Sequence, residues 1–238
     1  MEPHILYQDN DLLLVEKPSG MIVNRADTSK GVVTLQDWVD EKFPVSNFRA
    51  REKRTERHIE SPKSDEHVVA GYNKYDEYIS RSGIVHRLDK ETSGVIIVAL
   101  NVETFIAMQN QFKDGIVKKT YQALLHGKLT PMEGEINEPI GRLPWNRMRF
   151  GVLKEGRPAK TSYKVPGYLE SGEGKNKEEY SLVEVYPQTG RTHQIRVHFQ
   201  HIGYPVVSDA LYAGRKRGRR SRQKLSRHFL HASSITFK

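Results

Sequence analysis

The feature that most constrains the fold is a series of alternating apolar and polar segments with no regular helices between them. Residues 119–126, 159–165 and 180–186 alternate with the two-residue period of a β-strand. Parallel strands need long crossover connections, usually helices, whereas antiparallel strands can follow one another through short turns. The chain therefore predicts a mixed or antiparallel sheet, and a doubly wound fold is disfavoured.

Other segments complete this outline. In 192–202 we expect Ile195, Phe199 and Ile202 to form the buried face of a helix, with His193, Arg196 and Gln200 opposite. Thr34 and Asn101 are placed to cap two further helices, which end near 43–44 and at Gly115. Further strands are predicted at 11–17, 21–24, 95–100 and 229–237.

Composition narrows the class of protein. The 238 residues contain 37% hydrophobic residues, enough for one large domain, and carry a net charge of +9 that favours a polyanionic partner such as nucleic acid. There are no cysteines, which excludes disulfide scaffolds and thiolate zinc sites and fits a cytoplasmic location. No apolar run approaches the roughly 20 residues of a membrane span. We expect a cytoplasmic protein with no membrane partner.

Residues 45–82 interrupt the pattern, because charged residues dominate there and apolar residues are sparse. We interpret this segment as an inserted basic and polar loop. It is either a solvated linker or an arm that orders on RNA.

The segment 83–94 places one carboxylate, Asp89, among cations in a loop bounded by glycines that leads directly into the strand at 95–100. Catalytic groups are often held on loops that a rigid scaffold positions. The alternative is a salt bridge at the loop turn between Asp89 and Arg87 or Lys90.

Longer motifs decide whether Asp89 is a catalytic group or a member of a salt bridge. Residues 86–94 resemble the catalytic motif of RluA-type pseudouridine synthases, and residues 190–198 resemble the second hallmark of that family. Further similarities lie at 13–24, 118–121, 158–163 and 208–212, so the resemblance covers nearly the whole chain outside the insertion. It implies an α+β pseudouridine synthase fold, with a long, mainly antiparallel sheet, flanking helices and loops, and an active site in a central basic cleft.

By this resemblance, Asp89 acts on a uridine whose base is detached, turned and rejoined to the ribose through C5. A carboxylate can serve as a nucleophile toward C1′ or C6 or as a base at C2′, and the sequence leaves these routes open. Tyr121 matches the tyrosine that packs on the base, and Arg196 matches the basic partner of the aspartate. A cation beside a carboxylate favours its charged form. The family uses no cofactor and no metal.

Several cations are candidates for binding structured RNA, either ribosomal or transfer RNA. Arg87 is placed to fill the space that an extruded base leaves, although a phosphate clamp or a loop salt bridge would suit it equally. The basic run 215–224 is expected to follow RNA phosphates. The candidate RNA-binding residues are His86, Arg87, Lys90, Arg191, His193, Arg215, Lys216, Arg217, Arg219 and Arg220.

Three other functions are less well supported. A metal site at His86, His193, His198 and His201 lacks the accompanying cysteines or carboxylates, and a metal-dependent nuclease lacks clustered carboxylates. A non-catalytic RNA-binding or ribosome-assembly factor would not need Asp89 and Tyr121. We expect one catalytic domain over 1–238, a monomer without the S4 RNA-binding domain that many relatives carry, and a chain that ends sooner after its last strand than is usual in the family.

Overall fold

The computed structural model describes residues 2–26, 29, 31–44, 74–173 and 177–238. The chain forms two compact units. The first comprises residues 1–90 and 94–114, and the second comprises residues 91–93 and 115–238. The division falls inside the motif at 86–94, so that Asp89 belongs to the first unit and Glu91 to the second.

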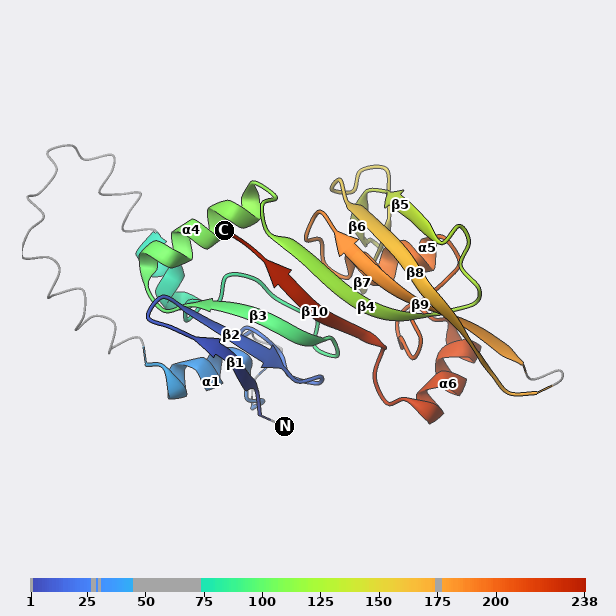
Figure 1. Ribbon diagram of the computed structural model, residues 1–238, viewed down its shortest axis with the longest axis horizontal. Coiled ribbons are helices and arrows are strands. Elements are labelled where there is room, and N and C mark those ends of the chain that lie inside the picture. The colour runs from blue at the N-terminus through green and yellow to red at the C-terminus, as the bar shows by residue number, and fades with distance from the viewer. Residues whose placement is uncertain (1, 27–28, 30, 45–73, 174–176) are drawn as a thin grey trace, which may run out of the picture. The chain divides into compact units, whose positions relative to one another are not determined.

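The first unit contains three antiparallel strands in the order β1-β2-β3 (Figure 1). They span β1 His4–Gln8, β2 Leu12–Lys17 and β3 Ser93–Ala99. Asp9 closes the β1–β2 turn, because its Oδ1 accepts hydrogen bonds from the backbone amides of Asp11 and Leu12 at 2.8 and 2.7 Å. β2 then pairs with β3 along its whole length, from Leu12 opposite Ala99 to Lys17 opposite Gly94.

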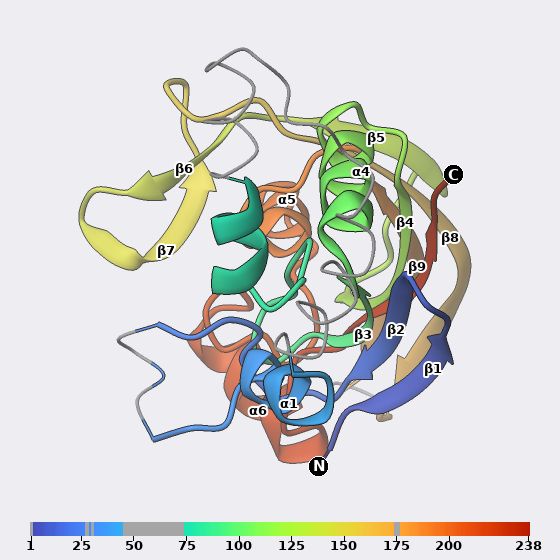
Figure 2. The same ribbon diagram turned by 90° about the vertical axis from the view of Figure 1, so that its left-hand side faces the viewer.

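Two helices of the first unit begin where their sequences predict. In α1, Leu35–Lys42, the Thr34 side chain accepts from the Asp37 amide, and Asp37 accepts in turn from the Thr34 amide. In α4, Val102–Lys113, Asn101 caps the amide of Thr104 at 2.8 Å. Figure 2 shows both helices, with β1 and β2 side by side.

The second unit contains five strands in the order β10-β4-β9-β8-β5, and all their pairings are antiparallel. Their bounds are β4 Lys118–His126, β5 Glu133–Asn137, β8 Lys160–Ser171, β9 Glu178–Pro187 and β10 Leu230–Thr236. Along β9, Val183 and Val185 are buried and Glu184 is half-exposed, as the alternation predicts. The predicted antiparallel sheet is therefore confirmed within each unit.

A hairpin and two helices complete the second unit. The hairpin of β6 Ile140–Leu143 and β7 Asn146–Val152 is a separate two-stranded sheet. Figure 2 shows it standing away from β4, β8 and β9 of the same unit. Helix α5, Gln194–His201, packs against β7, β8 and β9. Helix α6, Arg215–Lys224, follows it in the chain.

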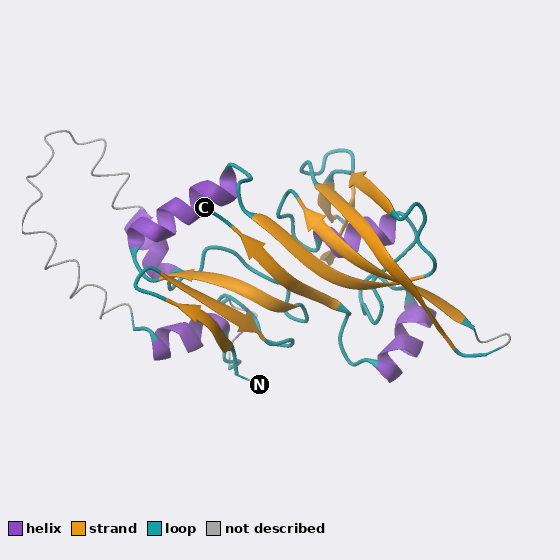
Figure 3. Ribbon diagram, viewed as in Figure 1, coloured by secondary structure: helices purple, strands orange, loops and turns teal. Residues whose placement is uncertain are grey.

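The structure corrects four predictions. Residues 21–24 form no strand. Besides β3, the partner of β2 is β1, a strand that the sequence did not reveal. Residues 74–80, predicted as loop, are helical, and Tyr78 there is 1% exposed. The run 215–224, for which no helix was predicted, is a helix (Figure 3), and its binding of RNA phosphates stays a prediction. Arg196, predicted on the face of α5 opposite its buried residues, is itself 5% exposed, because its guanidinium pairs with the buried Asp209 and lies over the ring of Tyr212.

The remainder of the predicted insertion, 45–73, lies outside the described residues. Within the described part of the chain, no helix is long and apolar enough to cross a membrane.

Candidate active site

The backbone next to Asp89 is held by a buried lysine. The Lys17 side chain is fully buried, and its Nζ donates to the carbonyl oxygens of Pro18, Met21 and Lys90 at 2.8, 2.9 and 3.1 Å. The Gly20 amide donates to the same Lys90 oxygen at 2.8 Å. Two donors therefore fix the peptide between Lys90 and Glu91, and the cost of burying the ammonium group is offset by three carbonyl partners.

The side chains around Asp89 differ in exposure. Leu88 is buried, Asp89 is half-buried, and Arg87 and Lys90 are exposed. His86 stacks near Phe112, with ring centroids 4.9 Å apart, and its Nε2 accepts from the Ile97 amide at 3.0 Å. The structure thus gives His86 a role in holding the loop to β3, whereas Arg87 and Lys90 are accessible to a polyanion.

The other end of the motif is anchored to α6 and β10. Arg222 Nη2 donates to both carboxylate oxygens of Glu91, at 2.8 and 2.9 Å. Thr92 Oγ1 lies 2.8 Å from His228 Nε2, and Ser93 Oγ lies 2.9 Å from His231 Nδ1. Three consecutive residues after Lys90 are therefore each held by a side chain from the last quarter of the chain, and no sequence pattern indicated these partners.

Arg196 forms a buried, bidentate ion pair with Asp209. Its Nε and Nη2 donate to Asp209 Oδ2 and Oδ1 at 2.7 and 3.0 Å, and the two side chains are 6% and 0% exposed. Burial acts to raise the pKa of Asp209, but the hydrogen bonds and charge of Arg196 outweigh it and hold the pKa below its usual 3.8. Asp209 belongs to the motif at 208–212, but its sequence alone indicates no role for it. The bidentate pair fixes the orientation of the Arg196 guanidinium.

His193 joins the same cluster through Tyr212. Its Nδ1 lies 2.8 Å from the Tyr212 hydroxyl, which also accepts from the Phe150 amide at 3.0 Å. The Arg196 guanidinium lies over the Tyr212 ring, 5.0 Å from its centroid. His193 has a φ of 56° at the start of α5, a left-handed conformation uncommon outside glycine and asparagine. Such conformations are frequent at functional sites.

Tyr121 lies on β4, between β10 and β9. It is opposite Ala232 on one side and Val185 on the other. Its side chain is half-buried and packs against the core cluster that contains Ala123, Val183 and Val185. The core supports the ring on one side and leaves part of it exposed, as a residue that contacts a base requires.

The basic run is divided between two faces of α6. Gly218 and Ser221 are buried, and Ser221 Oγ accepts from the Ser208 amide at 3.1 Å. Arg222 is paired with Glu91, so it is less available to phosphates than its neighbours. Arg220 lies 3.4 Å from Glu178. The exposed cations of the helix are Arg215, Lys216, Arg217, Arg219, Arg220 and Lys224.

His198 and Arg191 bond to the protein. His198 is fully buried, with Nδ1 2.9 Å from Thr161 Oγ1 and Nε2 3.0 Å from the Glu138 carbonyl. Arg191 Nε donates to the Pro158 carbonyl at 2.9 Å. Among the residues that the structure describes, no three histidine, aspartate or glutamate side chains are grouped as a metal site.

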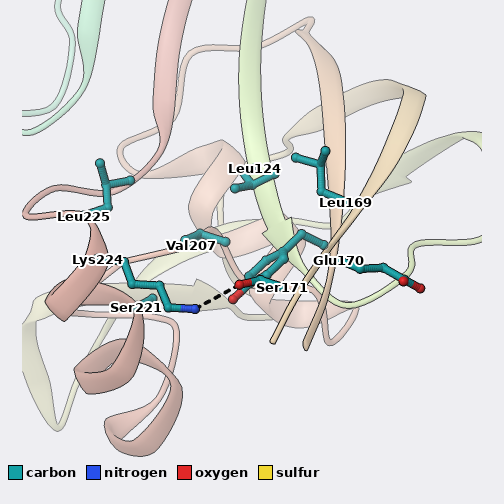
Figure 4. A pocket seen from close by; sticks show the side chains of 9 residues that line it. Leu124, Leu169, Glu170, Ser171, Val207, Ser221, Lys224 and Leu225 are labelled. Carbon is teal, nitrogen blue, oxygen red and sulfur yellow. Dashed lines mark hydrogen bonds between the residues drawn. The ribbon is translucent and has the colours of Figure 1, made fainter. Parts of the chain in front are cut away.

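A largely apolar pocket of about 320 Å³ lies beside α6 in the second unit (Figure 4). At its edge Lys224 Nζ bonds to Ser171 Oγ at 3.1 Å. Burial and a 2.7 Å hydrogen bond to Glu178 raise the pKa of Tyr180, in its wall, to about 12. The pocket contains none of the motif residues, and it is lined by Leu124, Leu169, Glu170, Ser171, Tyr180, Val207, Ser221, Lys224 and Leu225.

Comparison with known proteins identifies the family. Residues 11–201 match the RNA pseudouridylate synthase family model, which covers both the loop of Asp89 and the helix of Arg196. The chain belongs to the RNA pseudouridylate synthase family. An uncharacterized RNA pseudouridine synthase of Chloroflexus aurantiacus is 44% identical over 155 residues, which are 65% of this chain and 45% of that protein. Ribosomal large subunit pseudouridine synthase D of Borreliella burgdorferi is 35% identical over 209 residues, 87% of this chain and 54% of that protein.

A solved structure supports the assignment of this chain to the RNA pseudouridylate synthases. Human RNA pseudouridylate synthase domain containing 1 aligns with a TM-score of 0.68 and 27% identity, over 98% of this chain and 78% of that one. The family and the pseudouridine synthase fold predicted from the motifs are thereby confirmed. The chain spans about half the length of the curated relatives described above.

Proposed function

We propose that this protein converts uridine to pseudouridine in structured RNA, with Asp89 as the catalytic carboxylate. The observation that carries the proposal is the fixed position of the Asp89 loop, within a family whose model spans it. Lys17 and Gly20 hold the carbonyl of Lys90, the residue after Asp89, and Arg222 holds the carboxylate of Glu91, the next residue. A catalytic group needs such fixed geometry, whereas a surface carboxylate does not.

The proposed reaction is an isomerisation. The bond between N1 and C1′ breaks, a bond between C5 and C1′ forms, the C5 proton leaves and N1 ends protonated. Atoms and electrons balance within the uridine, so the reaction consumes no redox partner or group donor. Asp89 acts either as a nucleophile, at C1′ or C6, or as a base at C2′.

We assign the two supporting roles to residues of the second unit. Arg196, oriented by Asp209, supplies the cation that favours an ionised carboxylate. Tyr121, whose ring is backed by the core, contacts the target base. Both assignments rest on the match of these residues to the family motifs. We propose one catalytic domain over 1–238; the family model matches residues 11–201, which include parts of both units.

The proposed substrate is ribosomal RNA of the large subunit. Relatives from Borreliella burgdorferi and Nitrosomonas europaea, at 35% and 32% identity, are named as large subunit pseudouridine synthases. Transfer RNA is the alternative substrate. The net charge of +9 and the exposed cations of α6 favour either polyanion.

Mapping of pseudouridines tests the proposal and identifies the RNA. Total RNA is mapped from cells that contain the protein, cells that lack it, and cells that contain Asp89→Ala. We expect one or more large-subunit positions to disappear without the protein and to stay absent with Asp89→Ala. Asp114→Ala, an exposed carboxylate in the same unit, is the matched control and should restore them. Sites that persist with Asp89→Ala would contradict the catalytic role, and sites confined to transfer RNA would contradict the substrate assignment.

A further inference from the structure

The buried imidazole of His228 faces the motif of Asp89 with both of its nitrogens. The residue lies just before β10, and its side chain is 1% exposed. Its Nε2 lies 2.8 Å from Thr92 Oγ1, and its Nδ1 lies 3.4 Å from Glu91 Oε2. Thr92 is itself 2% exposed, so this hydrogen bond is shielded from water. His228 therefore contacts two consecutive residues of the motif, the second and the third after Asp89.

The backbone around His228 is fixed by the sheet. The next residue, Phe229, donates its amide to the Val207 carbonyl at 3.0 Å, and its own carbonyl accepts from the Leu124 amide at 3.2 Å. The His228 amide also donates to Glu91 Oε2, at 3.4 Å. The imidazole is thus held on a rigid backbone, and side chains on strands are positioned more accurately than side chains on free loops.

The Glu91 carboxylate connects His228 to the charged groups nearby. It accepts from Arg222 Nη2 through both oxygens, at 2.8 and 2.9 Å, and His228 Nδ1 approaches one of them. His228 is also close enough to Asp209 for its charge to act to lower the pKa of that carboxyl. Asp209 in turn orients Arg196. His228 therefore interacts both with the Glu91 carboxylate and with the ion pair of Arg196.

A buried histidine can also be a purely structural residue. His198 is of this kind, because its nitrogens contact Thr161 Oγ1 and the Glu138 carbonyl, which lie outside the motif at 86–94. The nitrogens of His228 instead face two side chains of that motif. A ring that only filled space would not need a nitrogen at either position.

We propose that His228 is a positioning residue for the reaction, which fixes Glu91 and Thr92 and thereby the catalytic loop, without touching the RNA. The inference rests on the proposed function, because it takes Asp89 as the catalytic carboxylate. A catalytic group displaced by about 1 Å can lose roughly 100-fold in rate, even when the altered residue lies away from the chemistry. Loss of the two contacts of His228 should therefore slow the chemical step and leave RNA affinity unchanged.

Single-turnover kinetics with the protein in excess tests this role. His228→Phe keeps a planar ring and removes both nitrogens, whereas the amide of His228→Gln can reach the position of Nε2 and bond to Thr92. At saturating protein, we expect His228→Phe to form pseudouridine roughly 10- to 100-fold more slowly than the parent, with an unchanged dissociation constant for RNA. His228→Gln should recover most of the rate. Because the rate is measured at saturation, a smaller folded fraction does not change it.

The matched control is His201→Phe, which alters an exposed histidine of the same unit and should react at the parent rate. A double-mutant cycle with Thr92→Val, which removes the hydroxyl, identifies the contact that carries the effect. If both residues act through one hydrogen bond, the double variant should react within about twofold of the slower single variant. If His228→Phe does not fold, Thr92→Val tests the same bond and should be slow, whereas Thr92→Ser should react near the parent rate.

Several results would each overturn the proposal. One is a His228→Phe rate within about twofold of the parent rate, and another is rate losses that multiply in the double variant. A His228→Gln rate as low as that of His228→Phe would do the same, because it would separate the effect from the bond to Thr92. In the fallback comparison, Thr92→Val at the rate of Thr92→Ser would contradict the role.

Hydrogen exchange separates a failure of this role from a failure of the proposed function. His228→Phe should speed amide exchange in residues 88–93 and leave exchange in α4 unchanged. If the parent protein forms pseudouridine and His228→Phe keeps its rate, only the role of His228 is wrong. If the parent forms no pseudouridine, the proposed function is wrong. Faster exchange would then still support His228 as the residue that holds the loop, and unchanged exchange would overturn that as well.

Discussion

Arg222 Nη2 donates to both oxygens of Glu91, at 2.8 and 2.9 Å, and Arg222 Nε donates to the Ser208 carbonyl at 3.1 Å. The guanidinium thus connects the motif of Asp89 to the turn that precedes Asp209, the partner of Arg196. Both members of the ion pair are about one third exposed, so its contribution to stability is small, roughly 0–1 kcal/mol. The ion pair matters because of its position, since Glu91 lies two residues after Asp89.

Replacing Arg222 should therefore affect the reaction more than stability. We expect Arg222→Ala to lower the single-turnover rate of pseudouridine formation roughly 10- to 100-fold, because the loop loses one of its anchors. Arg222→Lys should recover little, since a lysine cannot form the bidentate pair. Arg219→Ala, an exposed arginine of the same helix, is the control for lost charge. Equal rate losses for Arg219→Ala and Arg222→Ala would show that only charge matters.

The Arg196–Asp209 pair predicts a pH-dependent stability. Asp209→Asn leaves a buried guanidinium without its counter-charge, which should cost about 3–5 kcal/mol of unfolding free energy at pH 7. The pKa of Asp209 is lowered in the folded protein, so its stabilising effect is present above the unfolded value of 3.8 and is lost as the pH falls through the folded pKa. In urea denaturation between pH 7 and pH 3, the unfolding free energies of the parent and of Asp209→Asn should converge only below about pH 4. A difference in unfolding free energy that does not change with pH would contradict the ionised pair. Asp114→Asn, at an exposed carboxylate, is the control.

The exposed face of α6 predicts the salt dependence of RNA binding. Lys216 and Arg219 are exposed and carry no ion pair among those described, so they are available to phosphates. The double variant Lys216→Ala, Arg219→Ala should reduce the slope of log affinity against log salt by roughly one for each phosphate that the protein no longer neutralises. The rate at saturating RNA should not change. An unchanged slope would remove α6 from the RNA-binding surface.

The position of Arg87 predicts that activity depends on the structure of the RNA. It is exposed and lies two residues before Asp89, where it can occupy the space that an extruded base vacates. Arg87→Ala should lower activity on folded RNA more than on an unstructured fragment that contains the same uridine. Equal losses on both RNAs would favour a phosphate clamp over base replacement.

Local patterns predicted much of this structure. The caps at Thr34 and Asn101, the alternation in β9 and the apolar run of β3 are short-range signals, and the structure confirms each one. The basic run 215–224 is interrupted at Gly218 and Ser221, and residues three apart share a helix face, but no helix was predicted from this signal; the two residues form the buried side of α6. The weak alternation of β1 left that strand unrecognised.

Long-range partners could not be predicted in the same way. Glu91 and Arg222 are 131 residues apart, and Lys17 and Lys90 are 73 apart, so no local periodicity connects them. The burial of Arg196 involves Asp209 and Tyr212, which the amphipathic pattern of α5 does not include. Asp209 was visible as a motif residue, but only the fold identifies it as the partner of Arg196.

The most direct test measures release of the C5 hydrogen. Purified protein is incubated with large-subunit ribosomal RNA that carries tritium at C5 of uridine, and tritium released to water is counted for the parent protein, Asp89→Ala and Asp114→Ala. The proposed mechanism predicts release by the parent and Asp114→Ala, and none above background by Asp89→Ala. Release by Asp89→Ala at the parent rate would contradict it.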